Sequence, residues 1–128
     1  MSYFIDGIKG KDRPRFFKGH TFTPTATKEY EQKVKNSYTG QFYETEHIRV
    51  NIIAYYKIAN NTTKKKRKEI KEGLEYPKKK PDIDNIVKII LDGLNKTAYA
   101  DDKQVVEVTA LKRYTEQEDY VEYDIIAF

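Results

Sequence analysis

Two aspartates stand one residue apart in the stretch KKKPDIDNIVKIILDGLN, between a lysine run and an apolar pattern of helical period. Asp82 and Asp84 could do two kinds of chemistry there. Carboxylate oxygens are the ligands that a hard divalent cation prefers, usually together with waters and phosphate oxygens. Aspartates at the start of a helix also accept hydrogen bonds from its free backbone N–H groups and favour its dipole. On these two residues alone, capping is the simpler interpretation.

A second acidic pair follows the same helical pattern. Asp101 and Asp102 lie just before a strand-like segment that begins at Gln104. If the connecting loop runs back along the helix, this pair comes close to Asp82 and Asp84. So many carboxylates in one place are costly unless a cation neutralises them. Aspartate is also common in turns, so a turn is the alternative interpretation of the second pair.

A lysine shares a helical stripe with Asp84. Lys88 and Asp92 follow at intervals of four residues, which places all three side chains on one side of a helix. Lys88 could form an ion pair worth only a few tenths of a kcal/mol. It could instead stabilise negative charge on a phosphoryl oxygen or a leaving group. Asp92 could orient Lys88, and the residues alone leave these alternatives equal.

The composition is that of one soluble domain spanning residues 1–128. Hydrophobic residues make up 38% of the chain and charged residues 34%, and the apolar residues are spread along the chain, so we expect a folded domain rather than disorder. The chain has no cysteine, which excludes disulfides and thiolate zinc sites. No apolar run approaches the roughly 18 residues of a membrane span. The start MSYFIDGIKG lacks a signal-peptide pattern, so we expect an intracellular protein.

The charge is strongly polarised along the chain. The net charge is +4 overall, but residues 61–80 carry nine basic and three acidic side chains, whereas residues 101–128 carry three basic and eight acidic ones. Such a division favours a basic surface that binds a polyanion. For the Lys64–Lys68 run taken alone, a solvated helix is the simpler interpretation.

Hydrophobic periodicity predicts an α/β (α+β) domain with a small mixed sheet and helices on one face. The last helix carries the apolar positions Ile83, Ile86, Ile90 and Leu94 at helical spacing, and this face could pack on the sheet or line a dimer interface. The last two strands are expected to pair as a hairpin. The expected elements are a strand over Tyr3–Ile8, a helix from Thr25 or Thr27 to Ser37, a strand over His47–Ile58, a helix over Thr62–Gly73 that Gly73 ends, the helix after Pro81, and strands over Gln104–Tyr114 and Asp119–Phe128.

Taken together, these motifs resemble the RusA family of crossover-junction endodeoxyribonucleases of bacteria and their phages. The family pattern places D-x-D-N-x-x-K-x-x-x-D-x-L before D-D-x-Q-(V/I). The N-terminal GKDRPRFFKGHTFTP is also similar to the start of family members, so the resemblance covers nearly the whole chain. The sequence departs from the pattern at Gly93, where family members usually carry alanine. The matching residues are Asp82, Asp84, Asn85, Lys88, Asp92, Leu94, Asp101, Asp102, Gln104 and Val105.

The resemblance implies a homodimer that binds four-way (Holliday) DNA junctions and cuts two strands symmetrically in recombination and repair, using Mg²⁺ or Mn²⁺. The essential acids of the family, which hold the metal, map onto Asp82, Asp84 and Asp102, and its catalytic lysine maps onto Lys88. Asp101 is less clearly a ligand than its neighbour. A bacterial or phage-encoded cytoplasmic enzyme is expected. His20 and His47 lie outside the acidic motif and are interpreted as structural or surface residues, and no membrane partner is expected.

Contacts with DNA should come first from Lys and Arg to phosphates. The expected contacts are Arg13, Arg15, Lys78, Lys79 and Lys80, with the Lys64–Lys68 run as a second group. Tyr76 could stack on bases near the crossover, although a plain surface tyrosine is the simpler interpretation. Two alternatives to junction resolution are a nuclease specific for flaps, forks or RNA and a nucleic-acid-binding protein that has lost catalysis.

Overall fold

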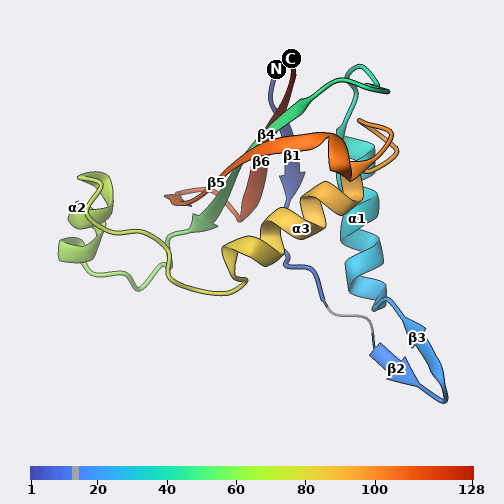
Figure 1. Cartoon of the computed structure of the whole chain (residues 1–128). Coiled ribbons are helices and arrows are strands. Elements are labelled where there is room, and N and C mark those ends of the chain that lie inside the picture. The colour runs from blue at the N-terminus through green and yellow to red at the C-terminus, as the bar shows by residue number, and fades with distance from the viewer. Residues whose placement is uncertain (13–14) are drawn as a thin grey trace.

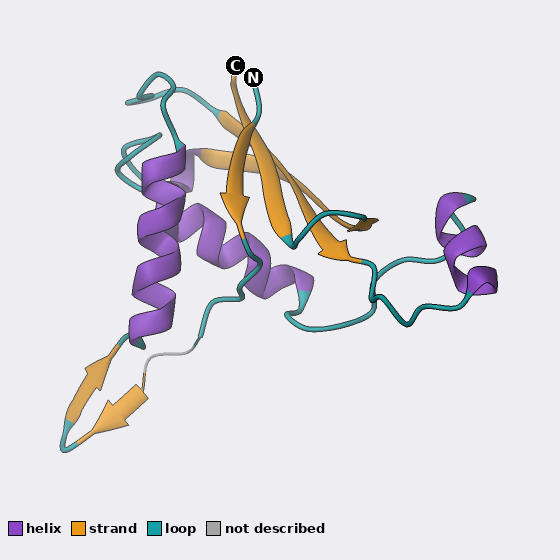
Figure 2. Ribbon diagram, turned by 180° about the vertical axis from the view of Figure 1, so that it is seen from behind, coloured by secondary structure: helices purple, strands orange, loops and turns teal. Residues whose placement is uncertain are grey.

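The structure, a computed structural model, describes residues 1–12 and 15–128. Its centre is a four-stranded mixed sheet in the order β1-β6-β4-β5. Helices α1 and α3 cover one face of this sheet, while α2 stands apart from it (Figures 1 and 2). The elements are β1 (Tyr3–Asp6), β2 (Arg15–Phe17), β3 (His20–Phe22), α1 (Thr25–Ser37), β4 (Ile48–Lys57), α2 (Lys64–Lys71), α3 (Ile83–Leu94), β5 (Val105–Thr115) and β6 (Tyr120–Ala127). The mixed sheet with helices on one face confirms the expected fold class.

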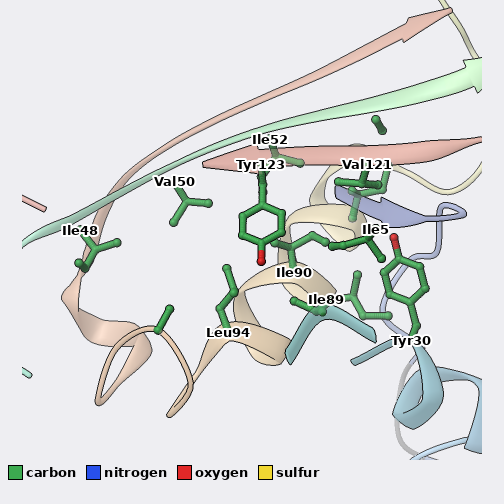
Figure 3. Packing of buried hydrophobic residues seen from close by; sticks show 14 of the residues in the cluster. Ile5, Tyr30, Ile48, Val50, Ile52, Ile89, Ile90, Leu94, Val121 and Tyr123 are labelled. Carbon is green, nitrogen blue, oxygen red and sulfur yellow. The ribbon is translucent and has the colours of Figure 1, made fainter. Parts of the chain in front are cut away.

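The core lies between the sheet and the two helices. Alternate residues of β4 are buried, because successive side chains of a strand point to opposite faces of the sheet. Figure 3 shows Ile48, Val50 and Ile52 of β4 facing Ile90 and Leu94 of α3. The last two are fully buried, and burying each such side chain is worth about 1.5–3 kcal/mol. The apolar stripe of α3 therefore packs on the sheet.

Ile83 is the exception on that stripe. It is 41% exposed, at the first residue of α3, and it lines an open hollow together with Ala110 and Leu111 of β5. Apart from Ile83, the apolar stripe of α3 therefore packs on the sheet rather than lining a dimer interface.

The expected hairpin between the last two strands is wrong. β5 pairs with β4 in parallel, and β6 pairs with β4 and β1 in antiparallel register, so β4 lies between β5 and β6. Local alternation shows that a segment is a strand but does not show which neighbour it joins. Ten residues of β4, buried in alternation, place it at the sheet centre, with a partner on each edge.

The helix ends are partly those expected from the sequence. Thr63 caps α2 by accepting a hydrogen bond from the Lys66 backbone N–H at 3.2 Å, and Gly73 follows α2 with a φ of +76°. This left-handed conformation suits glycine and ends the helix as predicted. α1 begins at Thr25, but its N-cap is Pro24 and no side chain caps it. The capping role expected for threonine is therefore absent there.

A short hairpin was missed by sequence reasoning. β2 and β3 pair in antiparallel register, and the residues between them, Lys18 and Gly19, have φ values of 48° and 81°. Two consecutive residues with positive φ form the tight turn that twisted hairpins prefer. The signal was a Lys-Gly pair between two short segments that contain aromatic residues, Arg15–Phe17 and His20–Phe22.

Helices α1 and α3 approach each other closely. A Cβ on Gly93 would lie 2.6 Å from the Cβ of Val34, so glycine at this position lets the two helices meet. Among the helices that the structure describes, none is long and apolar enough to cross a membrane.

Candidate active site

The first turn of α3 presents the two aspartates of the opening motif. Asp82 is the N-cap residue, with extended backbone, yet its side chain makes no capping hydrogen bond. Asp84 lies within the first turn, and both side chains are exposed. The backbone is extended at Asp82, and the helix already begins at Ile83. The capping interpretation fails for the Asp82 side chain, whose oxygens stay available to a ligand.

The N-terminal segment packs against this turn. The Lys11 backbone N–H donates to the Asn85 carbonyl at 2.9 Å. A Cβ on Gly10 would lie 2.7 Å from the Cβ of Pro81, so the close approach requires glycine. The contact leaves an open pocket of about 560 Å³ beside Asp82, lined by Ile8, Lys9, Gly10, Lys11, Asp12, Lys80, Pro81, Asp82 and Asn85. Three lysines thus contribute to the lining of the pocket on this side of Asp82.

A second hollow lies on the other side of Asp82. It measures about 480 Å³ and is lined by Tyr76, Asp82, Ile83, Ala110, Leu111, Lys112 and Arg113. The guanidinium carbon of Arg113 lies 4.8 Å from the centre of the Tyr76 ring, a cation–π contact. The Lys112 ammonium donates to the Lys79 carbonyl at 2.8 Å. Asp82 is therefore flanked by basic side chains on both sides, which suits a phosphate chain passing over it.

The remaining polar residues of α3 have separate partners. Asp92 forms an ion pair with Lys11 at 3.1 Å, and Lys11 also pairs with Glu31 of α1 at 2.8 Å. Burial alone would lower the pKa of Lys11, but hydrogen bonds to Glu31 and Asp92 outweigh it and raise the pKa. Lys11 thus ties the N-terminal segment to both helices, through Glu31 of α1 and Asp92 of α3. Lys88 is exposed and, among the described residues, has no ion pair with Asp84 or Asp92. Neither the ion pair suggested for Lys88 nor the orientation of Lys88 by Asp92 is therefore observed among the described residues.

The two aspartates after α3 differ in role. The Asp101 carboxylate accepts a hydrogen bond from the Lys103 N–H at 2.9 Å, and the Gln104 side chain accepts from the Asp101 N–H at 2.9 Å, which makes a capping box. The Lys103 N–H holds the pKa of the Asp101 carboxyl below its usual value. Asp102 is exposed, next to this cap. The turn interpretation therefore holds for Asp101 and leaves Asp102 free for other chemistry.

Asp102 lies at the opposite end of α3 from Asp82. The start of β5, Val105, pairs with Ile48, whereas Asp82 shares a pocket with Ala110–Arg113, further along the same strand. Six residues of strand span about 20 Å, and the twelve residues of α3 span about 18 Å. Figure 1 shows the same arrangement, with the loop after α3 far from the start of that helix. The loop does not run back.

The three predicted metal ligands therefore do not converge within one chain. Among the described residues, no group of three or more His, Cys, Asp or Glu side chains could hold a metal ion. Asp82 and Asp84 lie at one end of α3, and Asp102 lies at the other. Oxygen ligands on exposed, uncapped carboxylates fit a hard divalent cation, but one chain supplies only part of the set at either end.

The predicted DNA contacts have unequal positions. Lys78, Lys79 and Lys80 are exposed and lead directly into α3, and Lys80 lines the pocket of about 560 Å³ beside Asp82. The Lys79 ammonium lies 5.6 Å from the centre of the Tyr56 ring. Arg13 lies outside the described residues. Arg15 is the first residue of β2, and the structure describes the backbone of Arg15 only. His20 lies in β3 and His47 directly precedes β4, so both lie outside α3.

Sequence reasoning did not identify Lys9, Lys11, Lys112 and Arg113 as neighbours of Asp82. The signal for the last two was a Lys-Arg pair in an otherwise acidic segment, residues 101–128. Their position could not be foreseen because the expected hairpin would have placed β5 beside β6 rather than at the sheet edge near α3.

Comparison with known proteins agrees with this arrangement of motifs. The chain is 44% identical over 57 residues to the "Uncharacterized protein YqaN" of Bacillus subtilis (strain 168), a match that covers 44% of this chain and only 40% of that relative. The family profile described as "Endodeoxyribonuclease RusA" matches residues 7–125, nearly the whole chain, including both aspartate pairs and Lys88. The chain therefore belongs to the RusA family of endodeoxyribonucleases.

Proposed function

We propose that this protein is a Mg²⁺-dependent endonuclease, with Mn²⁺ able to substitute, that resolves four-way DNA junctions by paired cuts during recombination and repair in the bacterial cytoplasm. The observation that carries the proposal is the uncapped carboxylate of Asp82, which lies between two hollows lined by lysines and an arginine. Membership of the endodeoxyribonuclease family supports the hydrolytic reaction. A protein that only binds phosphates would gain nothing from exposed acids at this point, because they repel the ligand.

The residues have separate roles in this proposal. Asp82, Asp84 and Asp102 would hold the divalent cation, which supplies a hydroxide at neutral pH and polarises the scissile phosphate when bound. Lys88, exposed one turn after Asp84, would stabilise the charge that develops on the phosphate oxygens. The DNA backbone would be held by lysines beside the acids, Lys78, Lys79 and Lys80, and by Arg13 and Arg15 of the N-terminal segment.

The separation of the acids suggests that two copies of the chain form each site. A homodimer with two-fold symmetry would place Asp102 of one subunit near Asp82 and Asp84 of the other, and would give two equivalent sites for two scissile strands. The edge of β5 supports this arrangement. β5 pairs with β4 on one side only, and its residues Val106 and Val108 are 56% and 38% exposed.

The register of such a dimer follows from the exposed residues. If two β5 edges pair in antiparallel orientation around Glu107, Val106 of one copy lies opposite Val108 of the other. The same register brings Asp102 level with Lys112 of the partner subunit. Because Lys112 and Asp82 line the same hollow, this pairing would carry the missing carboxylate to the site. Exposed apolar side chains on a free strand edge are otherwise a hazard for aggregation.

Cleavage of a synthetic four-way junction tests the proposal. The protein should make paired nicks with Mg²⁺ or Mn²⁺ and none with EDTA, while linear duplex stays intact. The Asp82→Asn variant should bind the junction without cutting it. Binding without cutting by the unmodified protein under every metal condition would refute the enzyme and favour a DNA-binding role. Cutting of flaps, forks or RNA in place of junctions would correct the substrate.

Mixing two inactive variants tests the shared site. Asp82→Asn and Asp102→Asn proteins should each be inactive alone. In a mixed dimer with shared sites, one site carries both substitutions and the other carries neither, so nicking should return to about a quarter of the unmodified rate when equal amounts exchange freely. If each site belonged to one chain, both sites of the mixed dimer would be damaged and no activity would return.

A further inference from the structure

Helix α2 contributes nothing to the core. Six of its eight residues are Lys or Arg, and none of its side chains is buried. Figures 1 and 2 show it standing away from the sheet, at the end opposite the two chain termini. α1 and α3 complete the packing of the sheet without it. Its charges therefore need an explanation other than the stability of the fold.

The charges of α2 are also not arranged to stabilise the helix itself. Lys64–Lys66 form its first turn, which contains no acidic residue. Positive charge at a helix N-terminus opposes the helix dipole, typically by 0.3–1 kcal/mol per charge. Carboxylates lie near Arg67 and Lys68 only, at 3.6 Å from Glu116 and 3.9 Å from Glu72. Within the described part of the chain, no carboxylate pairs with the three lysines of the first turn.

A pocket connects α2 to the basic segment that leads into α3. It measures about 250 Å³, and most of its charged lining is positive. Its lining residues come from α2, from the ends of β4 and β5 and from the extended segment before α3: Lys57, Ala59, Thr62, Lys66, Ile70, Glu75, Tyr76, Lys78, Lys79 and Tyr114. Lys66 of α2 therefore shares one surface with Lys78 and Lys79 before α3, and Lys64 and Lys65 precede it in the same helical turn.

That surface continues to the candidate active site. Tyr76 lines the pocket beside α2 and also the hollow that contains Asp82. The six residues from Tyr76 to Asp82 span at most about 20 Å, which is about six base pairs of duplex at 3.4 Å each. A DNA arm whose scissile phosphate lies at Asp82 would thus reach Tyr76 within about six base pairs, and α2 lies further along, across the pocket that Tyr76 shares with Lys66.

We propose that Lys64–Lys66 of α2, together with Lys78 and Lys79, bind the phosphate backbone of one junction arm, on the α2 side of the cut. This inference rests on the proposed function, since it takes Asp82 as the position of the scissile phosphate. Lysine is a point charge on a flexible stem, so the contact is independent of base sequence. It adds affinity and fixes the direction of the arm without reading the DNA.

Salt dependence of binding in EDTA tests this contact without any cleavage. The triple variant Lys64→Gln, Lys65→Gln, Lys66→Gln is compared with Lys28→Gln, Lys33→Gln, Lys35→Gln on α1, which removes the same charge from a helix far from α2 (Figure 1). Each phosphate contact contributes about 0.9 to the slope of log K against log salt. The α2 variant should therefore lose about 2.7 from the slope, and the α1 variant should lose little.

Raising the salt from about 50 to about 200 mM should therefore weaken junction binding by the unmodified protein about 40-fold more than junction binding by the α2 variant. Arginine at the same three positions should restore the slope. Neutral methylphosphonates along the arm on the α2 side of the cut should weaken binding by the unmodified protein and leave binding by the α2 variant unaffected. Circular dichroism of each variant controls for folding.

The outcomes separate this inference from the proposed function. Junction cleavage with an unchanged salt slope in the α2 variant overturns the role of α2 and leaves the nuclease intact. A reduced slope on DNA, in a protein that cuts no junction, supports the α2 contact and refutes the nuclease. Equal losses in the α1 and α2 variants would mean that only net charge matters, which also overturns the inference.

Discussion

The two aspartate pairs look alike in the sequence but differ in what their side chains do. The Asp101 carboxylate takes part in a capping box with Gln104, whereas Asp102 beside it is exposed. Asp82 occupies a capping position without making the side-chain bond. Spacing alone could not make these distinctions, since aspartate suits both a cap and a metal. The hydrogen bonds of the backbone decide between them.

The first prediction follows from this difference. Asp102→Asn should lower junction cleavage by at least 100-fold with unchanged thermal stability, because it removes a proposed metal ligand. Asp101→Asn should retain most of the cleavage, since an asparagine oxygen can still accept from the Lys103 N–H. Cleavage rates and melting curves of both variants check this. Equal loss of activity in the two variants would make Asp101 a ligand as well.

Two buried tyrosines allow a matched test of side-chain hydrogen bonding. The Tyr30 hydroxyl donates to the Gly7 carbonyl at 2.8 Å, whereas the buried Tyr56 hydroxyl has no partner within the described residues. Tyr30→Phe should therefore lower the free energy of unfolding by about 1 kcal/mol, and Tyr56→Phe should leave it unchanged or raise it by about 1 kcal/mol. Urea unfolding of both variants gives the values. A large loss in Tyr56→Phe would reveal a partner for that hydroxyl.

At the scale of elements, the helices could be predicted closely and the strand partners could not. α1 and α2 begin and end near the predicted residues, because helix breakers such as Gly73, which ends α2, act locally. The order of the strands depends on which edges meet across the whole sheet, and local alternation carries no record of that. The error at β5 also hid Lys112 and Arg113, because a misplaced strand takes its side chains to the wrong neighbours.

The contact between α1 and α3 gives an element-scale prediction. Gly93→Ala adds a Cβ only 2.6 Å from the Cβ of Val34, so the helices must separate. Overpacking of this kind typically costs about 1–3 kcal/mol, against about 1 kcal/mol gained from alanine in a helix. We expect a net loss of about 1 kcal/mol in urea unfolding.

The matching variant is Val34→Ala, which makes room for the new methyl group. The double variant should be more stable than the sum of the single losses by about 1 kcal/mol or more, the sign of residues in direct contact. Such coupling would mean that Val34 is the reason why glycine is needed at position 93. If the losses of unfolding free energy in the two single variants simply add, the contact between Gly93 and Val34 contributes nothing to stability.

At the scale of the whole molecule, the proposed β5 pairing predicts a specific cross-link. The chain has no cysteine, so Glu107→Cys introduces a single thiol at the proposed two-fold axis, where facing Cα atoms lie about 4.5–5.5 Å apart and can form a disulfide. Thr109→Cys is the control, since the same register moves its copies about 14 Å apart. Non-reducing gels should show a covalent dimer for the first variant only. Cross-linking of both, or of the control alone, would require another interface.

Stability at high pH is a second property of the whole molecule. Burial raises the pKa of Tyr56 and Tyr123 to about 12, from an ordinary value of about 10. The unfolded chain therefore loses these protons first as the pH rises. The stability they contribute is complete below about pH 10 and falls between about pH 10 and 12. Urea midpoints should decline over that interval, and less steeply in Tyr56→Phe. A flat profile would mean that these rings are accessible to water.

If two subunits form each site, a newly made single chain has no complete site. It has Asp82 and Asp84 at one end of α3 and Asp102 at the other. Such a chain could meet chromosomal DNA before it met a second copy, and it would leave that DNA intact. At low abundance, the cutting rate would then rise with the square of the chain concentration. The opposite placement of Asp82 and Asp102 would act as a concentration threshold, which spares the genome in which the enzyme is made until enough of it has accumulated.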